Sequence, residues 1–378
     1  MRLKCQMSVP ESRRRHTVLW LKTAIPLLFG RPCRALALFC LLIAPAVSSR
    51  NAQVESILYS FAGKPDGAYP NAAPVFDSSG NLYVTTQYGG SYGHGAIFQL
   101  SPSGAPAVLY SFTGGNDGES PFGALIISGD MLYGTSSGGG AYGYGTVFEV
   151  TTSGQLTTLY SFHGGADGWD PICTLLMDAQ GNLYGTTPDG GSGYGTVFEL
   201  TPSGVETVLY SFSGGTDGNG PNGGLVLYNG NLYGTTADGG SSGHGTVFEV
   251  TPSGTETVIY SFAGGTDGSA PVAPLIVGNN GVLYGTTTQA GSSDYGVVFS
   301  ITTSGAETVL HTFTGPSSDG AFAWGPLVLD ASGNLYGTTE QGGAYNGGII
   351  FEITPSGAES VLYNFNPGFV AWGSDLRR

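Results

Sequence analysis

The body of this chain contains almost no basic side chains. The sequence has 378 residues with 12 Lys and Arg against 27 Asp and Glu, and eight of the basic residues lie within the first 34 positions. Between Asn51 and Leu376 the only basic residue is Lys64, which faces 26 carboxylates. Binding to nucleic acid and to anionic lipid depends on cationic side chains. The composition therefore excludes nucleic acid as a partner and membrane insertion of the mature domain, while a neutral ligand or a divalent cation remains compatible.

Cysteine is equally scarce after the N-terminal region. Three of the four cysteines fall within the first 50 residues, which leaves Cys173 alone in the body. A single thiol cannot form an internal disulfide, so the domain must be held together by packing. With no histidine partner nearby, we expect Cys173 to be a small buried apolar side chain rather than a nucleophile.

Long apolar runs are also missing. The two longest, 18–30 and 35–47, are each too short for a membrane span of about 20 residues, and the basic stretch 13–15 precedes them. The second run ends in the small-x-small pattern 44–46 that suits signal peptidase. We therefore predict that residues 1–50 are a signal peptide or targeting segment and that the protein is secreted, extracellular or held at the cell surface. An uncleaved N-terminal anchor is the alternative.

A repeat of about 50 residues dominates the remainder of the chain. The phenylalanine that closes the segment Leu-Tyr-Ser-Phe recurs at intervals of 50 to 52 residues, at Phe61, Phe112, Phe162, Phe212, Phe262, Phe313 and Phe365. Each interval contains an apolar stretch, then Gly-Asn-Leu-Tyr-Gly-Thr-Thr, then Gly-Thr-Val-Phe-Glu, or close variants of them. Each unit therefore carries four short segments that are rich in β-branched and aromatic residues and bounded by turn residues, which is typical of strands.

Four strands per unit and no helical periodicity predict an all-β, six-bladed β-propeller built from four-stranded repeats. We assign the propeller to residues 51–366, a C-terminal tail to 367–378, and a monomeric state to the protein. A parallel β-helix is the alternative fold. The first copy of the Tyr-Ser-Phe strand (57–61) and the last (361–365) are equivalent candidates for closing the ring, and the sequence does not choose between them.

The combined motifs Gly-Asn-Leu-Tyr-Gly-Thr-Thr, Gly-Thr-Val-Phe-Glu and Leu-Tyr-Ser-Phe-x-Gly-Gly-x-Asp-Gly resemble the GloVer tandem repeat of environmental bacteria. The resemblance covers about 310 residues and all six units. It implies an extracellular or surface-held protein of the "choice-of-anchor" kind, and it implies no reaction and no catalytic residues. This sequence ends without the apolar tail of many such proteins.

One carboxylate recurs in every unit, directly before a glycine. A turn explains this pattern, because aspartate accepts a backbone N–H and glycine takes the left-handed conformation. Alternatively, the six carboxylates lie on one rim and bind calcium; no other cofactor is expected. The candidate metal ligands are Asp66, Asp117, Asp167, Asp217, Asp267 and Asp319.

Variation between units indicates where a ligand could bind. The loop after Asp-Gly carries an aromatic residue in some units and small polar residues in others, and exposed aromatics can stack on sugars or peptide side chains. The candidate ligand-binding residues are Tyr69, Phe122, Trp169 and Trp324. A second position, before the Val-Phe strand, predicts a surface aromatic belt of His94, Tyr144, Tyr194, His244 and Tyr295.

No unit carries a distinct set of acid, base and nucleophile. We therefore expect a binding module for an extracellular glycan, a cell-surface component or another protein, since near-identical units suit repeated weak contacts. Two alternatives stay open: a hydrolase or lyase that acts on an extracellular polysaccharide in the propeller channel, and a purely structural surface protein.

Overall fold

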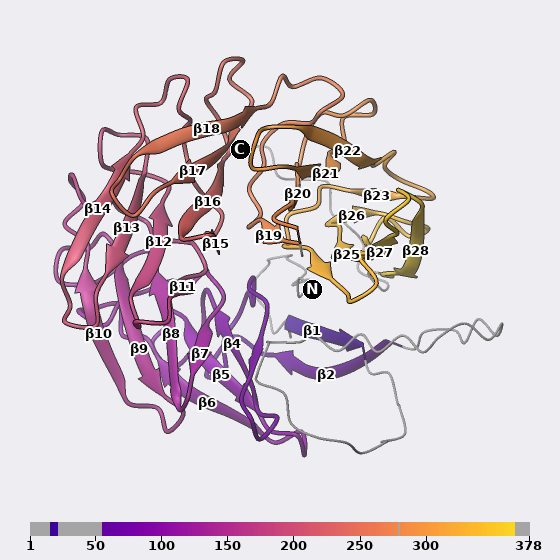
Figure 1. Ribbon diagram of the computed structural model, residues 1–378. Helices are drawn as coiled ribbons and strands as arrows, with labels where there is room; N and C mark the ends of the chain where they lie inside the picture. The colour runs from indigo at the N-terminus through magenta and orange to yellow at the C-terminus, as the bar shows by residue number, and fades with distance from the viewer. Residues whose placement is uncertain (1–15, 22–54, 279, 367–378) are drawn as a thin grey trace, which may run out of the picture.

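Six four-stranded antiparallel sheets form a six-bladed β-propeller in the computed structural model, which describes residues 16–21, 55–278 and 280–366 (Figure 1). No helix occurs in these residues. Blade one comprises β3 (Val75–Phe76), β4 (Leu82–Thr86), β5 (Ala96–Leu100) and β6 (Pro106–Ser111), and blade two comprises β7 (Ile126–Ser128), β8 (Met131–Ser136), β9 (Thr146–Thr151) and β10 (Leu156–Ser161). Blade three comprises β11 (Leu176–Met177), β12 (Leu183–Thr187), β13 (Thr196–Leu200) and β14 (Glu206–Ser211), and blade four comprises β15 (Val226–Tyr228), β16 (Asn231–Thr236), β17 (Thr246–Val250) and β18 (Glu256–Ser261). Blade five comprises β19 (Ile276–Val277), β20 (Leu283–Thr286), β21 (Val297–Ile301) and β22 (Glu307–Thr312), and blade six comprises β24 (Val328–Leu329), β25 (Leu335–Thr338), β27 (Ile349–Ile353) and β28 (Glu359–Asn364). The predicted fold and number of blades are confirmed.

Each blade is a simple meander whose strands follow one another from the axis outwards (Figure 1). The short apolar segment forms the inner strand, the Leu-Tyr-Gly-Thr-Thr and Thr-Val-Phe-Glu segments form the middle strands, and Leu-Tyr-Ser lies in the outer strand. Two further short strands, β23 (Gly320–Ala321) and β26 (Gln341–Gly342), pair with each other beside the sixth blade.

The hydrophobic core lies between the blades rather than within one sheet. Phe162, at the end of the outer strand of blade two, packs into blade three against Phe198, with a ring-centroid distance of 5.3 Å. Cys173 is buried in the same cluster and free, as expected from the sequence. A buried phenylalanine of this kind stabilises a fold by roughly 2–3 kcal/mol. Equivalent clusters at the other blade contacts explain why the phenylalanine recurs in every unit.

The Gly-Thr-Thr motif fastens neighbouring blades near the axis. The first threonine donates its hydroxyl to a carbonyl of the next blade, as in Thr135 to Cys173 O and Thr186 to Gly223 O, both at 3.0 Å. The glycine is needed because its partner strand places Phe198 directly over Gly185, where a Cβ would come within 2.5 Å of the ring. Buried hydroxyls with a carbonyl partner avoid the desolvation penalty of an unmade hydrogen bond.

The first and the last copies of the outer-strand segment occupy different places in the fold. The last copy of the outer strand, β28, belongs to the sixth blade. The first copy, β2 (Glu55–Phe61), lies outside the six sheets and pairs with β1 (His16–Leu21), while Phe61 packs against blade one. The sixth sheet therefore consists only of strands from its own repeat.

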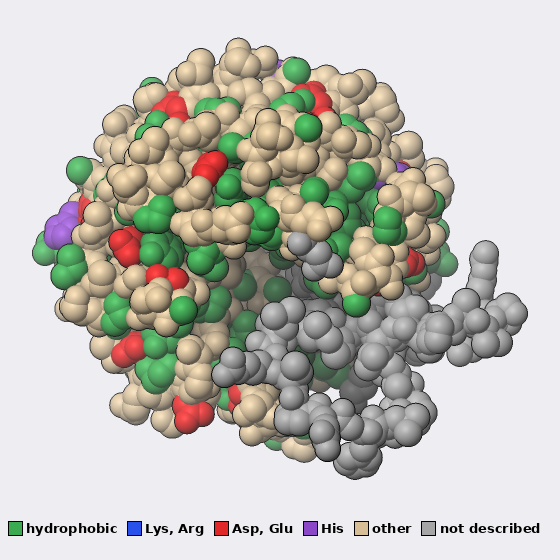
Figure 2. Space-filling view, viewed as in Figure 1, with side chains coloured by type: hydrophobic (Ala, Val, Ile, Leu, Met, Phe, Trp, Pro, Cys, Tyr) green, Lys and Arg blue, Asp and Glu red, His purple; other side chains and the backbone are tan. Residues whose placement is uncertain are grey.

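The predicted targeting segment, apart from β1, and the predicted tail at 367–378 lie outside the described residues. No helix in the described part of the chain is long and apolar enough to cross a membrane. The face of the ring seen in Figure 2 is hollowed at its centre, and acidic side chains are scattered around the hollow.

Candidate functional site

Two sets of long loops meet on one face of the ring. In a four-stranded meander, the connection between the second and third strands and the connection to the next blade emerge at the same end of the sheet. Bridges between the two loops confirm this placement, as for Trp169 with Asp189 and for Ala68 with Tyr88. The opposite face carries short turns, such as Thr-Pro-Ser-Gly at 201–204. The variable loop residues therefore lie on the face that can present a binding surface.

Tyr144 and its equivalents lie against the first glycine of the loop that leads to the next blade. Gly164, at a φ of +74°, is so close to the Tyr144 ring that a Cβ would come within 2.5 Å of it. The same relation holds for Gly114 with His94 and for Gly214 with Tyr194. Tyr144 and Tyr194 are both 41% exposed, so these rings are surface groups supported by backbone.

A small pocket lies beside this support at the contact between blades two and three. Its volume is about 230 Å³, and its lining is Ser137, Gly143, Tyr144, Trp169 and Asp170. The Tyr144 and Trp169 rings are stacked, with centroids 5.7 Å apart and an interplanar angle of 14°.

One carboxylate faces the pocket. Asp170 takes a left-handed conformation, with a φ of +58°, and its backbone N–H donates to the carbonyl of Tyr144 at 3.2 Å. Burial, followed by the charge of Asp189, raises the pKa of Asp170, while a hydrogen bond from Ser137 opposes the increase. The pocket therefore offers a flat aromatic surface, a carboxyl group and a hydroxyl group to a ligand.

The four predicted ligand-binding residues do not share one place in the loops. Trp169 is 38% exposed and lines the pocket. Tyr69 is half-buried and meets Tyr88 edge-to-face at 5.4 Å. Phe122 and Trp324 are half-buried at a third position, five residues after the aspartate of their loops. The structure thus places one of the four, Trp169, in a pocket.

Each of the six predicted aspartates is held within its own loop at the outer edge of a blade contact. Asp217 is typical, because it accepts hydrogen bonds from the hydroxyl of Tyr210 at 3.0 Å and from the backbone N–H of Ser213 at 2.7 Å. Burial alone would raise the pKa of Asp217, but the Ser213 and Tyr210 hydrogen bonds lower it below its ordinary range. These contacts are those of a turn that also ties the loop to the outer strand.

The structure adds a carboxylate that the sequence interpretation missed. The first residue of the outer strand in the next blade is a glutamate at four contacts, where it lies beside the loop aspartate: Glu206, Glu256, Glu307 and Glu359. Burial first, and then the charge of Asp217, raise the pKa of Glu256 to about 7. The sequence signal was the Glu-Thr-Val pattern, but its distance from the aspartate along the chain, 39 residues, hides the pairing.

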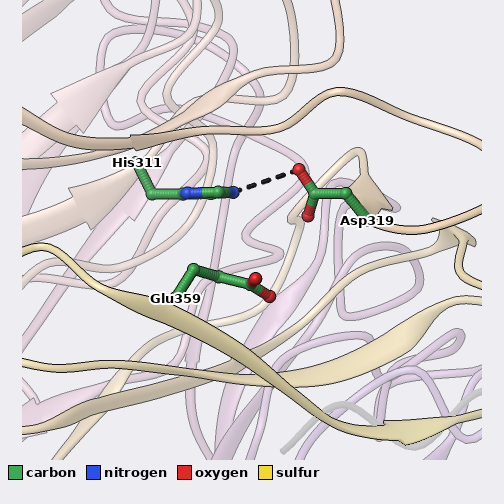
Figure 3. Close-up of side chains that lie close together, drawn as sticks. All are labelled: His311, Asp319 and Glu359. Carbon is green, nitrogen blue, oxygen red and sulfur yellow. Dashed lines mark hydrogen bonds and ion pairs between the residues drawn. The ribbon is translucent and has the colours of Figure 1, made fainter.

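One of these contacts differs from the others, because histidine replaces the tyrosine of the outer strand (Figure 3). His311 Nε2 lies 3.1 Å from Asp319 Oδ2, and one ligand atom from each of His311, Asp319 and Glu359 falls within 4.8 Å of the others. Within the described residues, this is the single group of three side chains of the kind that could hold a metal ion. It includes one predicted aspartate, and the other five are not brought into any such group there.

The chain belongs to the Gloeobacter/Verrucomicrobia repeat family, whose model matches residues 47–235 and 192–374. No curated protein matches the sequence at a significant level.

Among solved structures, the chain is similar to a Bacteroides uniformis protein assigned as a 6-phosphogluconolactonase, with 16% identity, a TM-score of 0.51 and coverage of 82% of this chain and 88% of that one. It is also similar to a puromycin-hydrolyzing peptidase of Mycobacterium tuberculosis, with 10% identity, a TM-score of 0.52 and coverage of 82% and 48%. The chain spans about half the length of the peptidase. Identities this low show a shared fold alone.

Proposed function

We propose that this protein is an exported β-propeller binding module and that its ligand is a neutral glycan. The observation that carries the proposal is the pocket at the contact between blades two and three, where Trp169 and Tyr144 stack beside Asp170 and Ser137. Stacked aromatic rings offer an apolar face, and the carboxyl and hydroxyl groups can exchange hydrogen bonds with sugar hydroxyls.

The size and charge of the site support this class of ligand. The pocket is shallow and open, and its volume of about 230 Å³ is below the roughly 300–1,000 Å³ of pockets for drug-sized molecules, which suits one sugar ring lying on the surface. The scarcity of basic side chains in the body of the chain disfavours anionic sugars. Export is supported by the basic and apolar composition of residues 1–50.

The binding test compares two substitutions on the same loop face. We expect the wild-type protein to bind a subset of neutral oligosaccharides on a glycan array, and Trp169→Ala to weaken that binding at least tenfold in calorimetric titration, as for a central aromatic contact. Tyr194→Ala is the matched control, because Tyr194 occupies the position of Tyr144 at the next blade contact and is equally exposed. The control should bind normally, and both variants should melt within about 2 °C of wild type.

Three results would contradict parts of the proposal. The assignment of a glycan as the ligand would be wrong if the array shows no binding, or if Trp169→Ala and Tyr194→Ala bind with the same affinity. Export would be wrong if the full-length protein, expressed in a diderm bacterium, stays in the cytoplasm with its N-terminal segment intact by mass spectrometry.

A further inference from the structure

The contact between blades five and six combines one nitrogen and two carboxylate ligands at the outer edge of the ring (Figure 3). His311 comes from β22 in blade five, Asp319 from the loop that follows, and Glu359 from the start of β28 in blade six. We propose that these three side chains bind one divalent transition-metal ion of the zinc class. This site is separate from the glycan pocket and does not depend on the proposed function.

Two of the three ligand atoms already lie at a separation that suits a zinc ion. Zinc lies about 2.0–2.2 Å from imidazole nitrogen and carboxylate oxygen, so two of its ligands in tetrahedral geometry are roughly 3.3 Å apart. The separation of 3.1 Å between His311 Nε2 and Asp319 Oδ2 is close to that value. The ligand oxygen of Glu359 lies within 4.8 Å of the other two, so this side chain would complete the site by moving towards the ion.

The surroundings of the three side chains resemble those of a metal site. The backbone N–H groups of Thr314 and Gly320 orient the Asp319 carboxylate at 2.8 and 2.6 Å, as outer-shell partners orient metal ligands. Oε1 of Glu359 is buried and has no hydrogen-bond partner within the described residues, as is also true of the equivalent oxygens of Glu206, Glu256 and Glu307, so the imidazole is what distinguishes this contact. Metal ligands bind in their deprotonated forms, so in the ion-bound state two carboxylates and one imidazole would carry a charge of −2, which a divalent ion balances.

The ligand set indicates which ion would bind. Calcium prefers six to eight oxygen ligands, whereas imidazole together with carboxylates suits zinc and its neighbours. At the contact between blades three and four, the same positions hold Tyr210, Asp217 and Glu256. That set lacks a nitrogen ligand, and it serves as an internal comparison within the same chain.

An ion at this place would join three segments of the last two blades. The sixth sheet, like the other five, contains strands of its own repeat only, so its attachment to the ring depends on contacts with its neighbours. A ligand that binds the folded state raises the unfolding midpoint by mass action. We therefore expect the ion to stabilise the packing of blade six against blade five.

The test uses full-length protein treated with EDTA and then titrated with Zn²⁺ by calorimetry and with Co²⁺ by visible absorption. We expect saturable binding at micromolar concentrations, a Co²⁺ spectrum without a thiolate band, and a midpoint that rises by at least about 3 °C with Zn²⁺. His311→Tyr, which restores the residue of the other repeats, should lower the affinity at least tenfold. His163→Ala should not, although His163 also lies 3.0 Å from an aspartate, Asp167.

A gain-of-site variant keeps the result independent of folding losses. Tyr210→His in the His311→Tyr background would place imidazole beside Asp217 and Glu256, and we expect it to recover the Co²⁺ spectrum. The proposal would be overturned if wild type binds no ion after EDTA treatment, or if His311→Tyr and His163→Ala bind the metal as wild type does.

Discussion

The contacts between blades three and four and between blades five and six share one framework. They differ in one outer-strand residue, tyrosine or histidine, and in a loop that is one residue longer at the second contact. In both, a buried phenylalanine crosses from one blade to the next, a loop aspartate accepts backbone N–H groups, and a glutamate of the next blade lies beside that aspartate. In the first contact the aspartate accepts a side-chain hydrogen bond from Tyr210, and in the second it accepts one from His311. A repeated structural element thus becomes a candidate metal site where histidine replaces tyrosine and the loop is one residue longer.

The largest effect on stability should come from the buried phenylalanine that crosses between blades at both contacts. Phe212 and Phe313 are both fully buried, so Phe212→Ala and Phe313→Ala should each lower the free energy of unfolding by about 3–5 kcal/mol. Urea unfolding followed by tryptophan fluorescence measures both. A cost for Phe313→Ala below half that for Phe212→Ala would show that the two cores are not equivalent.

The aspartates should have the next largest effect. Asp217→Asn and Asp319→Asn each exchange a carboxylate oxygen for an amide group that cannot accept the same hydrogen bonds, which should cost about 1–3 kcal/mol. Asp319 should be the costlier of the two, because it also accepts from the backbone N–H of Gly320, while the contacts with His311 and Tyr210 are equivalent. Melting in EDTA checks the order, and a smaller loss at Asp319 would contradict it.

The glutamates beside the loop aspartates should make the stability of the protein depend on pH. The pKa of Glu256, about 7 in the folded protein against an ordinary 4.5, lies above its unfolded value, so the associated stability is present below pH 4.5 and is lost as the pH rises through 7. Glu256→Gln should therefore stabilise the protein at pH 8, by about 1 kcal/mol because the group keeps some contact with solvent. At pH 4 it should have no effect. Calorimetric melting at both values is the measurement.

The equivalent glutamate at the other contact sharpens the comparison. Burial and the charge of Asp319 raise the pKa of Glu359, and the charge of His311 partly offsets them. In EDTA, Glu359→Gln should therefore also stabilise the protein at pH 8, because burial and Asp319 disfavour the ionised glutamate in the folded protein. A loss of stability at pH 8 in calorimetric melting would contradict this.

The smallest effect should come from the residue that distinguishes the two contacts. In EDTA, His311→Tyr should change the free energy of unfolding by less than about 1 kcal/mol, because tyrosine already fills this position beside Asp217 and donates to it. A loss of several kcal/mol without metal, seen in urea unfolding, would show that the loop around Asp319 has adapted to histidine.

The repeat made the fold predictable from the sequence. The recurring Phe162 and its equivalents gave the period, and turn residues on either side of each segment gave four strands per unit. The pocket was predicted only in part. Trp169 was named as a candidate, but its neighbour Asp170 was not, because the left-handed backbone that brings Asp170 to Tyr144 depends on a hydrogen bond between blades.

The candidate metal site could not be predicted as a group, because its three residues belong to separate segments of the repeat. His311 replaces the tyrosine of Leu-Tyr-Ser-Phe in one unit, and by itself this replacement indicates no partner. Glu359 lies 40 residues after Asp319 in the chain. They meet because the outer strand of each blade begins beside the loop that ends the preceding one.

Period, strand content and the shortage of cations are local or summed properties of the chain, and the sequence alone determined them. The stacking of Trp169 on Tyr144 and the convergence of His311, Asp319 and Glu359 were decided by the closure of the blades into a ring. The physical reason is that chemistry depends on separations of a few ångströms, and only packing between repeats sets those for residues some 40 positions apart.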